Sequence, residues 1–592
     1  MNRRGREIIC ADMSACRPGE ALAWEHRPNA WRLVDYETEH GLKGVMAFAD
    51  PELGAPELEL ALNVRGPHRI YLGINYVKSR YGTAYQEYPP YGNLEVRLTG
   101  DPGFTRVGAE QITIEHASAL KATASSKFGG GKLVPRSIQE AYWKTADLSG
   151  QSLIFRPPVA PYNREPWWGI SNLSYVRLVP LTAEEEVAWR ELQPRPETRR
   201  VAFLYCAGNL SGHIDTGPGD FHPTSLDWFK NEIMPCLDSD IGLLSIEAIR
   251  GSYCTFRTRI GDVGGPDNRW QEEWVDPLAA FARLGHEHGI RVLVGMRMIG
   301  AAYPTTRDPI GWARFFWQHQ EWVKRDREGA PTTSLSLAYP QVREYWLSLL
   351  REALDYGIDG VTVYLHRFCP FVLYEQPVVE SFLAQHGVDP RTLPEDDPLW
   401  LQHCAAYVTG FLRQVRALID EVPGRVLAVT FYGGPSKYDR SPDWHPIRYN
   451  CDVEAWIRER LADYLFPTQY PLASLIQKWS KLGQGRVHIW PDLMPAAQVG
   501  QDIARQASIY YQAGADGICL RDAERRAPRF SEWAVARHLG HRELLDRLIQ
   551  EAPSYYRRVP IKHLMGFATR YSFNNFGGVD PLSRAGSPCH ER

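Results

Sequence analysis

The sequence predicts a multidomain protein in which an all-β sandwich is followed by a (β/α)8 TIM barrel. The chain has 592 residues, which is more than one compact domain of ~100–200 residues holds. Residues 24–182 consist of short alternating runs between turn residues, a pattern typical of antiparallel sheets. From 200 to 550, continuous apolar runs alternate with amphipathic stretches, which is typical of a parallel sheet buried on both faces by helices.

The sandwich is predicted over residues 24–182. Gly, Pro and Asn separate its strand-like runs, which include HRIYLGINY, NLEVRLTG, GQSLIFRPP and LSYVRLVPL. Residues 1–23 are basic at the start and have no apolar run, so we expect a flexible N-terminal segment without a signal peptide. A polar helical stretch that contains Pro194 and Pro196 follows the sandwich, and we expect residues 183–199 to be a linker.

The barrel is predicted over residues 200–550 from eight repeats of a strand followed by a helix. Helices are expected to end in left-handed glycine caps at Gly289, Gly357, Gly483 and Gly514. An open doubly wound sheet is the alternative, and residues 551–592 are expected to form a C-terminal extension with a loose end. The predicted strands are VAFLYC (201–206), GLLSIEAI (242–249), RVLVGMRM (291–298), GVTVYL (360–365), RVLAVTFY (425–432), DYLFPTQ (463–469), RVHIWP (486–491) and GICLRD (517–522).

Charge and motifs exclude several classes of function. The 67 basic and 70 acidic residues nearly cancel, so the overall charge does not favour nucleic acid or an anionic membrane. No run approaches the ~20 apolar residues that span a bilayer. The ten Cys contain no CxxC pair, and no phosphate-binding loop, dinucleotide fingerprint, GxSxG or HExxH occurs. We therefore expect no cofactor, no metal and a cytoplasmic location, unless a signal has been removed.

Polar and aromatic residues are predicted to gather at the C-terminal ends of the barrel strands, where barrel enzymes hold their active sites. Two carboxyl groups across a cleft are the minimum for cleavage of a glycosidic bond, while aromatic rings and polar donors suit a polyhydroxylated ligand. The residues in question are Glu247, Arg250, Arg297, His366, Arg367, Glu375, Tyr432, Gln469, Tyr470, Trp490, Asp492, Arg521 and Asp522. Aromatic residues make up 12% of the chain, and some of them are expected to line this cleft rather than the cores.

Each acidic residue also has a structural interpretation. Asp359 begins the fourth strand and is expected to be a turn residue, and Asp452 precedes a helix that it would cap. Asp492 follows Trp490-Pro491 and could cap a loop, while Asp522 could pair with Arg521. The remaining two favour a functional role: Glu247 would be costly inside a strand unless it is paired, and Glu375 lies among aromatic residues and prolines in a long loop.

Three segments of the predicted barrel carry a resemblance to known proteins: SLAYPQVREYWLSLLREALDYGIDGVTVYLHRF, DVEAWIRERLADYLFPTQY and AGADGICLRD. They resemble glycoside-hydrolase-like proteins of the type called family-10-like, in which the first segment has the form "NPxVRxY…GxDGV". The front domain resembles the β-sandwich modules that accompany such barrels. The resemblance implies carbohydrate chemistry over residues 200–550. Many family members carry an Asp near the end of strand four where this chain has Tyr364, so Glu375 is the substitute that the resemblance leaves.

The resulting prediction is a glycoside hydrolase with a carbohydrate substrate, such as a sugar from a plant or bacterial polysaccharide. By analogy with glycosidase barrels, Glu375 is the expected acid/base and Asp492 its partner carboxylate, with Glu247 and Asp522 in reserve. Arg250, Arg297, His366, Arg367, Gln469 and Tyr432 would bind hydroxyls or a carboxylate, and Trp490 and Tyr470 would stack on a ring. The arginines favour an anionic sugar. A barrel lyase or isomerase acting on a sugar acid, a non-catalytic carbohydrate-binding protein and a homo-oligomeric assembly stay open.

Overall fold

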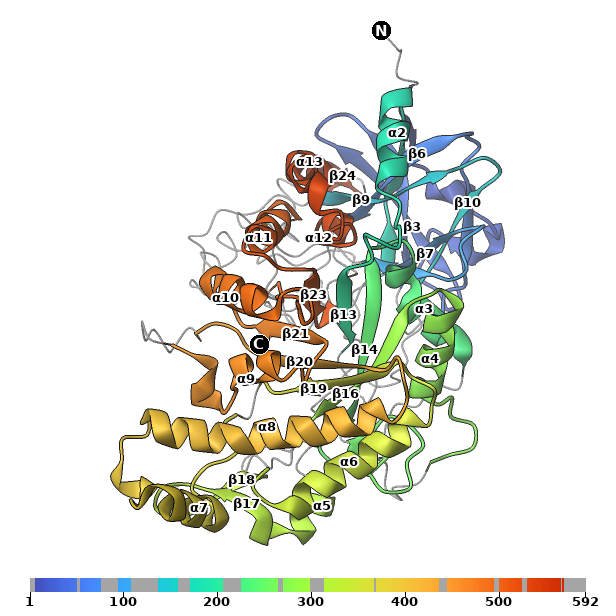
Figure 1. Ribbon diagram of the computed structural model, residues 1–592. Helices are drawn as coiled ribbons and strands as arrows, with labels where there is room; N and C mark the ends of the chain where they lie inside the picture. Colours follow the sequence, from blue (N-terminus) through green and yellow to red (C-terminus); the bar gives the residue numbers. More distant parts are fainter. Residues whose placement is uncertain are drawn as a thin grey trace.

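The structure is a computed structural model. It describes residues 6–49, 54–75, 94–107, 137–157, 171–205, 225–263, 270–298, 314–366, 369–435, 444–493, 500–523, 527, 530–565 and 567–568. Figure 1 shows an all-β domain near the N-terminus and a larger domain, in which helices surround strands, that fills the rest of the molecule.

Eight parallel strands form the centre of the larger domain, and each coincides with a predicted strand. The strand order is β22-β21-β20-β19-β16-β14-β13-β23. At seven of the eight junctions between neighbouring strands, the pairing is a continuous ladder of backbone hydrogen bonds. The strands are β13 (Val201–Tyr205), β14 (Ile241–Arg250), β16 (Arg291–Arg297), β19 (Gly360–Tyr364), β20 (Val426–Tyr432), β21 (Tyr464–Thr468), β22 (His488–Ile489) and β23 (Ile518–Arg521).

A bridge between Asp492 and Cys519 joins the two ends of this sheet. Cys519 N donates to Pro491 O at 3.0 Å, and Leu493 N donates to Cys519 O at 3.1 Å. The chain beyond β22 therefore pairs with β23, and the eight strands close on themselves as a barrel requires. This contact excludes the open doubly wound alternative.

Helices follow the strands and bury their apolar faces on the outside of the sheet. Gly289, Gly357 and Gly514 have φ angles of 66°, 72° and 96°, as left-handed positions after helices need. The fourth predicted cap is wrong, because Gln484 (φ 50°) rather than Gly483 takes the left-handed position. The helices are α3 (Leu226–Leu237), α4 (Pro277–Glu287), α5 (Arg314–Gln318), α6 (Pro340–Leu354), α7 (Gln376–His386), α8 (Pro398–Asp420), α9 (Val453–Arg458), α10 (Ala473–Gly483), α11 (Gly500–Gln512), α12 (Phe530–Ala536) and α13 (Leu545–Glu551).

The loops that follow the barrel strands carry additional elements. A short strand β15 (Tyr253–Cys254) folds back on the end of β14, and a hairpin of β17 (Val323–Arg325) and β18 (Pro331–Leu335) lies between β16 and α6. This hairpin lies near α7 in Figure 1, at the end of the molecule remote from the β domain.

The β domain is a sandwich of two mainly antiparallel sheets. The larger sheet has the order β1 (Ile8–Cys10), β12 (Tyr175–Pro180), β6 (Pro67–Asn75), β9 (Ser137–Asp147), β24 (Tyr556–Leu564), β3 (Trp31–Thr38), β4 (Lys43–Ala49) and β11 (Ser171–Leu173), with β2 (Leu22–Ala23) and β25 (Phe567–Ala568) at the side. The smaller sheet has the order β5 (Leu58–Ala61), β10 (Ser152–Arg156), β7 (Leu94–Leu98) and β8 (Thr105–Val107).

Alternating apolar residues of both sheets fill the space between them. Trp31 of the larger sheet packs edge-on against Phe155 of the smaller one, with 5.2 Å between the ring centroids. Leu72, Val96 and Leu153 belong to the same buried cluster. Period-two alternation thus places one face of each strand in a shared core, as the sequence pattern predicts.

The sandwich extends beyond its predicted bounds at both ends of the chain. Residues 8–10, within the segment expected to be flexible, form β1 and pair with β12. Residues 556–564, within the expected C-terminal extension, form β24 between β9 and β3. The predicted linker contains the helix α2 (Ala183–Glu191), which begins with a capping box of Thr182 and Glu185. The sandwich is therefore built from residues on both sides of the barrel.

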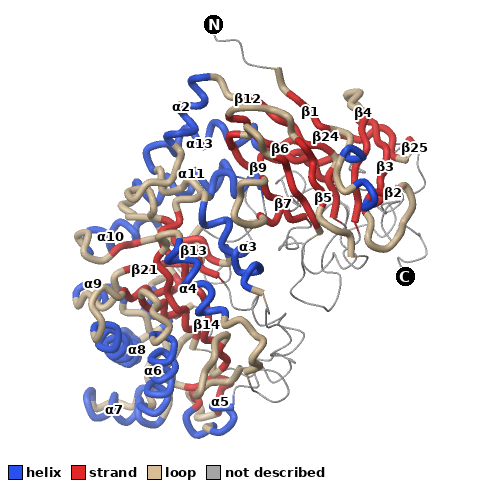
Figure 2. Tube along the Cα trace, turned by 90° about the vertical axis from the view of Figure 1, so that its right-hand side faces the viewer, coloured by secondary structure: helices blue, strands red, loops and turns tan. Residues whose placement is uncertain are grey.

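Side chains from both domains meet where the sandwich adjoins the barrel. Phe104 N donates to Asn231 Oδ1 of α3 at 2.9 Å, and Arg106 pairs with Glu232 at 2.6 Å. Tyr142 of β9 stacks on Tyr555, with 4.7 Å between the centroids. Figures 1 and 2 both show α13 next to the strands of the sandwich. Among the described residues, no helix has the length and apolar character needed to cross a membrane.

Candidate active site

Side chains that point into the barrel form layers along its axis. The lower layer is apolar and includes Leu243, Leu293, Phe466, Trp490 and Cys519, which belong to one buried cluster. Side chains alternate between the two faces of a strand, so residues two or four positions further along also point inward. At the carboxyl ends of the strands this rule places Glu247, Arg297, Asp492 and Arg521 above the apolar layer.

Glu247 lies on β14 and is 1% exposed. Arg297 Nη2 of the neighbouring strand donates to Glu247 Oε2 at 2.5 Å, and Arg250 Nε lies 3.9 Å from Glu247 Oε1. The register of β14 shifts between Glu247 and Ile249, where the strand has one residue more than β16. Such a bulge changes the direction of the following side chains, so Arg250 of the same strand comes close to the Glu247 carboxylate that Arg297 already contacts.

Gly295 makes room for the unusual tyrosine at the end of the fourth strand. A Cβ atom on Gly295 would lie 2.6 Å from the Tyr364 ring and 2.9 Å from Glu247 Cα. Tyr364 is buried, and its ring lies 5.4 Å from the Arg297 guanidinium carbon. Burial, reinforced by the Glu247 carboxylate, raises the pKa of Tyr364 well above its usual value. Tyr364 is therefore a neutral phenol inside the barrel.

Asp492 follows β22 and is fully buried. Its Oδ1 accepts a hydrogen bond from Arg521 N at 3.0 Å, and its Oδ2 lies 3.6 Å from Arg521 Nε. Burial alone would lower the pKa of Arg521, but the charges of Asp492 and Asp522 raise it above the usual value. The charge of Arg297 acts in the opposite direction on Arg521, so the Glu247–Arg297 and Asp492–Arg521 pairs are close enough to influence each other.

A histidine and two hydroxyl groups continue the same layer. His366 is fully buried, and its Nδ1 lies 2.6 Å from Thr430 Oγ1 of β20. The His366 ring centroid lies 5.4 Å from that of Tyr364 and 6.3 Å from that of Tyr432. These side chains come from β20 and from the end of β19 and the residues just after it, so the polar layer continues from Tyr364 to the neighbouring strand.

The backbone is strained at two of the strand ends. Gln469 and Tyr470, directly after β21, have φ angles of 58° and 53°, and Asp522, directly after β23, has a φ of 49°. Residues other than glycine pay an energetic cost in this region, which is common at functional sites. Gly434 allows the loop after β20 to pass close by, because a Cβ atom there would lie 2.0 Å from Tyr470 O. Tyr470 is 50% exposed, so its ring remains accessible.

Glu375 has a different environment from the strand-end carboxylates. It is fully buried at the N-cap of α7, and its Oε2 accepts a hydrogen bond from Leu373 N at 2.8 Å. Burial raises its pKa, and the opposing influences come from the backbone of Glu375 and Leu373, Ser336 and Lys324. These neighbours belong to its own loop and to the β17–β18 region. Among the described residues, Glu375 therefore has no contact with the strand-end carboxylates and arginines, and its role as acid/base stays a prediction.

Trp490 is a core residue, which corrects its predicted stacking role. It is 6% exposed and belongs to the apolar lower layer, where its ring lies 5.0 Å from that of Tyr464. Trp490 and Asp492 are two positions apart, so both point into the barrel, but Trp490 lies in the apolar layer and only Asp492 reaches the polar layer. Arg367 lies outside the described residues.

Asp359 and Asp452, for which the sequence favours a structural interpretation, have structural roles. Asp359 Oδ2 accepts a hydrogen bond from Val292 N at 2.7 Å at the amino end of β19. Asp452 caps α9 by accepting a hydrogen bond from Ala455 N at 3.0 Å. Two site residues, Tyr364 and Thr430, were absent from the predicted site. Val426, Ala428 and Thr430 are two positions apart in turn, so the alternation of side chains along the strand would have identified Thr430 as an inward residue.

No family model and no curated protein matches this chain. Among solved structures, an α-galactosidase from Thermus thermophilus is similar at 12% identity, with 87% of this chain and 95% of that chain covered and a TM-score of 0.33. A cycloalternan-degrading enzyme from Trueperella pyogenes is similar at 11% identity, with 90% and 82% covered and a TM-score of 0.33. A maltogenic α-amylase from Thermotoga neapolitana has 12% identity, 60% and 77% coverage and a TM-score of 0.29. At these TM-scores the likeness carries no argument about the activity of this chain.

Proposed function

We propose that this protein is a glycosidase whose two catalytic carboxylates are Glu247 and Asp492. The observation that supports the proposal is the pair of buried carboxylates in the polar layer of the barrel, each held by an arginine from a neighbouring strand. Two inward carboxylates at the mouth of a closed barrel are the groups that glycosidic bond cleavage requires. Buried charges at strand ends are costly in free energy, which favours a functional reason for their presence.

The surroundings of the two carboxylates suggest different roles. Asp492 accepts a backbone N–H and faces the Arg521 guanidinium, and both contacts stabilise the anion. We therefore assign Asp492 as the nucleophile or as the base that activates water. Glu247 Oε1 has no hydrogen-bond partner among the described residues, so this oxygen is the one that can give a proton to the leaving group. Arg297 would then hold the Glu247 side chain through its other oxygen.

The polar layer also indicates the kind of sugar that the site accepts. Arg250, Arg297 and Arg521 are all buried beside it, and guanidinium groups bind carboxylates with two parallel hydrogen bonds. A uronic acid or another anionic sugar would therefore complement the site. Tyr470 offers an exposed ring at the same ends of the strands, and such a ring can stack on the apolar face of a sugar.

Activity assays on three matched variants test the assignment. Glu247→Gln and Asp492→Asn are each expected to lose at least about 10³-fold in kcat on a good substrate, because removal of a catalytic group commonly costs this much. Glu375→Gln is the comparison, and it should retain most of the activity. The substrates are a panel of aryl glycosides, aryl uronides and natural polysaccharides, with products separated by chromatography. Circular dichroism verifies that each variant is folded.

The outcomes separate the alternatives. Loss of activity in Glu375→Gln, together with retention in Glu247→Gln, would return the acid role to Glu375. An unsaturated or isomerised product would favour a lyase or isomerase acting on a sugar acid, for which the buried arginines and His366 are the supporting observation. Binding of oligosaccharides without turnover would instead favour a carbohydrate-binding protein, in which Tyr364 replaces the missing acid.

A further inference from the structure

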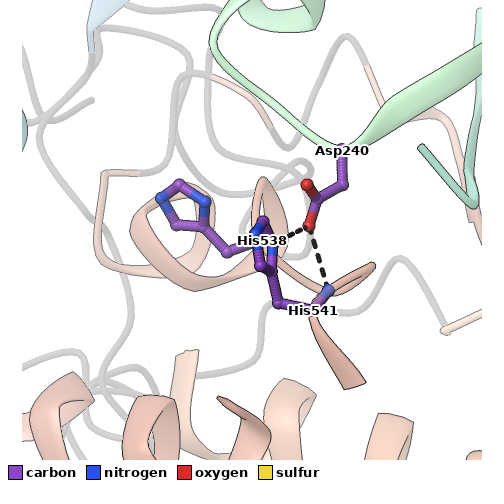
Figure 3. A group of neighbouring side chains, drawn as sticks. All are labelled: Asp240, His538 and His541. Atoms are coloured by element: carbon purple, nitrogen blue, oxygen red, sulfur yellow. Dashed lines mark hydrogen bonds and ion pairs between the residues drawn. The ribbon is translucent and has the colours of Figure 1, made fainter. Parts of the chain in front are cut away.

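A second group of buried polar side chains lies near the amino ends of the barrel strands. Asp240 immediately precedes β14, while His538 and His541 follow α12 in the turn that leads to α13. Figure 3 shows the Asp240 carboxylate directed at the His541 ring, with the His538 ring beside them. Catalytic residues of barrels lie at the opposite, carboxyl ends of the strands, so this group is separate from the proposed active site.

The three side chains are close enough to share one ion. One potential ligand atom from each residue lies within 4.8 Å of the other two. Asp240 Oδ2 lies 2.8 Å from His541 Nδ1 and accepts a hydrogen bond from His541 N at 3.2 Å. The rings of His538 and His541 are 6.1 Å apart at their centroids. The carboxylate and one imidazole are therefore already in contact, and the second imidazole lies next to them.

Gly540 allows the backbone between the two histidines to approach Asp240. A Cβ atom at this position would lie 1.8 Å from Thr198 O and 2.8 Å from Asp240 Cβ. Asp240 N also donates to Arg537 O at 2.7 Å, just before the turn. The local chain is thus held in a conformation that brings residues about 300 positions apart in sequence to one point.

Two polar atoms of this group lack hydrogen-bond partners. His538 Nδ1 and Asp240 Oδ1 are buried and unpaired among the described residues. Asp240 and His541 are both fully buried. Buried polar atoms are nearly always satisfied by a partner, and an unpaired one calls for an explanation such as an ion.

We propose that Asp240, His538 and His541 bind a divalent transition metal ion, with Zn²⁺ as the best match. Two imidazoles and one carboxylate are the ligands that Zn²⁺ accepts, whereas Mg²⁺ and Ca²⁺ prefer oxygen ligands only. The ion would take the place of the proton between Asp240 and His541. Zn–N distances of ~2.0–2.1 Å imply ligand atoms ~3.3 Å apart in a tetrahedral site. The His538 ring would therefore move closer when the ion binds, while Asp240 Oδ2 and His541 Nδ1, which are 2.8 Å apart, would separate slightly. Water completes the coordination.

The position of the site indicates a structural role. The turn that carries both histidines continues through α13 to β24, which lies in the middle of the larger sandwich sheet. Asp240 belongs to the segment that enters the second barrel strand. A metal ion here would fix the C-terminal part of the chain on the barrel at the point from which it crosses to the sandwich.

Metal analysis of the full-length chain tests the proposal. After dialysis against a chelator, titration with ZnCl₂ in a calorimeter should show one ion bound per chain, and the melting temperature should rise on addition of Zn²⁺ as mass action requires. The decisive variant is His538→Gln, since it removes one ligand without touching the Asp240–His541 contact. It should weaken Zn²⁺ binding by more than the ~10–100-fold that loss of an outer-shell partner costs.

A second histidine–aspartate pair provides the matched control. His286 Nε2 lies 2.9 Å from Asp359 Oδ2 at the surface, and the described part of the chain offers this pair no third ligand. His286→Gln should bind one Zn²⁺ ion with the affinity of the wild type. The proposal fails if the wild-type chain binds no ion, or if His538→Gln and His286→Gln bind it equally well. Because binding and melting temperature are measured without a sugar, either result is independent of the proposed glycosidase activity.

Discussion

Lys324 is a buried cation, and its environment implies that the stability of the fold depends on pH. Its side chain is 6% exposed, and its Nζ donates to Pro370 O at 2.6 Å. Burial lowers its pKa from 10.5 to about 8, although the Glu375 carboxylate partly opposes this. The lysine is thus harder to protonate in the folded chain than in the unfolded chain.

The sign of the pH effect follows from that difference. Below pH 8 the folded protein holds a buried charge, and this cost in stability disappears as the pH rises from about 8 to 10.5. At 1.36 kcal/mol for each pKa unit, the change is about 3 kcal/mol. Lys324→Met should therefore be more stable relative to the wild type at pH 7.5 than at pH 10.5. Lys230→Met, at an exposed helix position paired with Asp227, should show no such trend in urea unfolding.

At the level of single residues, the sequence predicts the polar layer of the barrel only in part. Glu247, Arg297 and Asp492 were identified because each comes at the end of a recognisable apolar strand. Trp490 was misassigned because the strand was treated as a whole, without separating its inward residues into layers. The environment of Glu375 could not be predicted, since it depends on the β17–β18 hairpin that packs beside its loop.

Strand β24 depends on a buried carboxylate of its neighbour. Glu140 of β9 is 1% exposed and accepts hydrogen bonds from Arg557 of β24 at 2.7 Å, from Arg177 of β12 at 2.6 Å and from Tyr175 Oη at 2.8 Å. Burial alone would raise its pKa, but the two guanidinium groups lower it below 4.5. Three strands of the larger sheet are therefore linked through one anion.

Substitution of Glu140 should loosen the C-terminal strand. Glu140→Gln leaves two arginines without their anion, and loss of one partner of a buried ion pair costs about 3 kcal/mol. Since the folded pKa is depressed, the stabilisation is present above the unfolded value of 4.5 and is lost as the pH falls through the folded value. The melting temperature of the wild type should thus fall in acid, and that of the variant should fall less.

An exposed pair supplies the control for this measurement. Glu57 pairs with Arg156 at 2.8 Å and its side chain is 45% exposed, so Glu57→Gln should change stability by no more than ~1 kcal/mol. Equal melting temperatures for Glu140→Gln and Glu57→Gln at neutral pH would contradict the role given to Glu140.

At the level of elements, all eight barrel strands were predicted, because each is a continuous apolar run followed by a helix. Strand β24 was missed, although YRRVPIKHL alternates and buries Val559, Ile561 and Leu564. Its Arg, Lys and Pro residues are typical of exposed segments. Its partners β9 and β3 lie hundreds of residues earlier, and pairing at such a distance leaves no local signal.

The molecule as a whole is a barrel inserted between two parts of a sandwich. The chain leaves the larger sheet after β12, forms the barrel, and returns to the sheet as β24. The sandwich therefore cannot be completed until the barrel has been synthesised. The proposed metal site lies on the return path, and the proposed active site lies at the other ends of the barrel strands. The proposed metal site and the proposed active site thus lie at opposite ends of one barrel.

This arrangement predicts how the chain responds to shortening. A chain that ends after Tyr555 lacks β24, which pairs with β9 on one side and β3 on the other. The backbone groups of both neighbours would lose their hydrogen-bond partners, and the cluster around Val559 and Ile561 would open. Limited proteolysis should then cut first within residues 6–182, while barrel fragments persist.

Two further experiments decide whether the loss of β24 causes the proteolysis of the shortened chain. A chain that ends after Ala568 keeps both β24 and β25 and should resist the protease as the full-length protein does. Addition of a synthetic peptide with residues 553–568 to the shorter chain should restore part of that resistance, because the strand can pair from outside as a separate segment. A shorter chain that is already as resistant as the full-length protein would show that β3 and β9 hold together without β24.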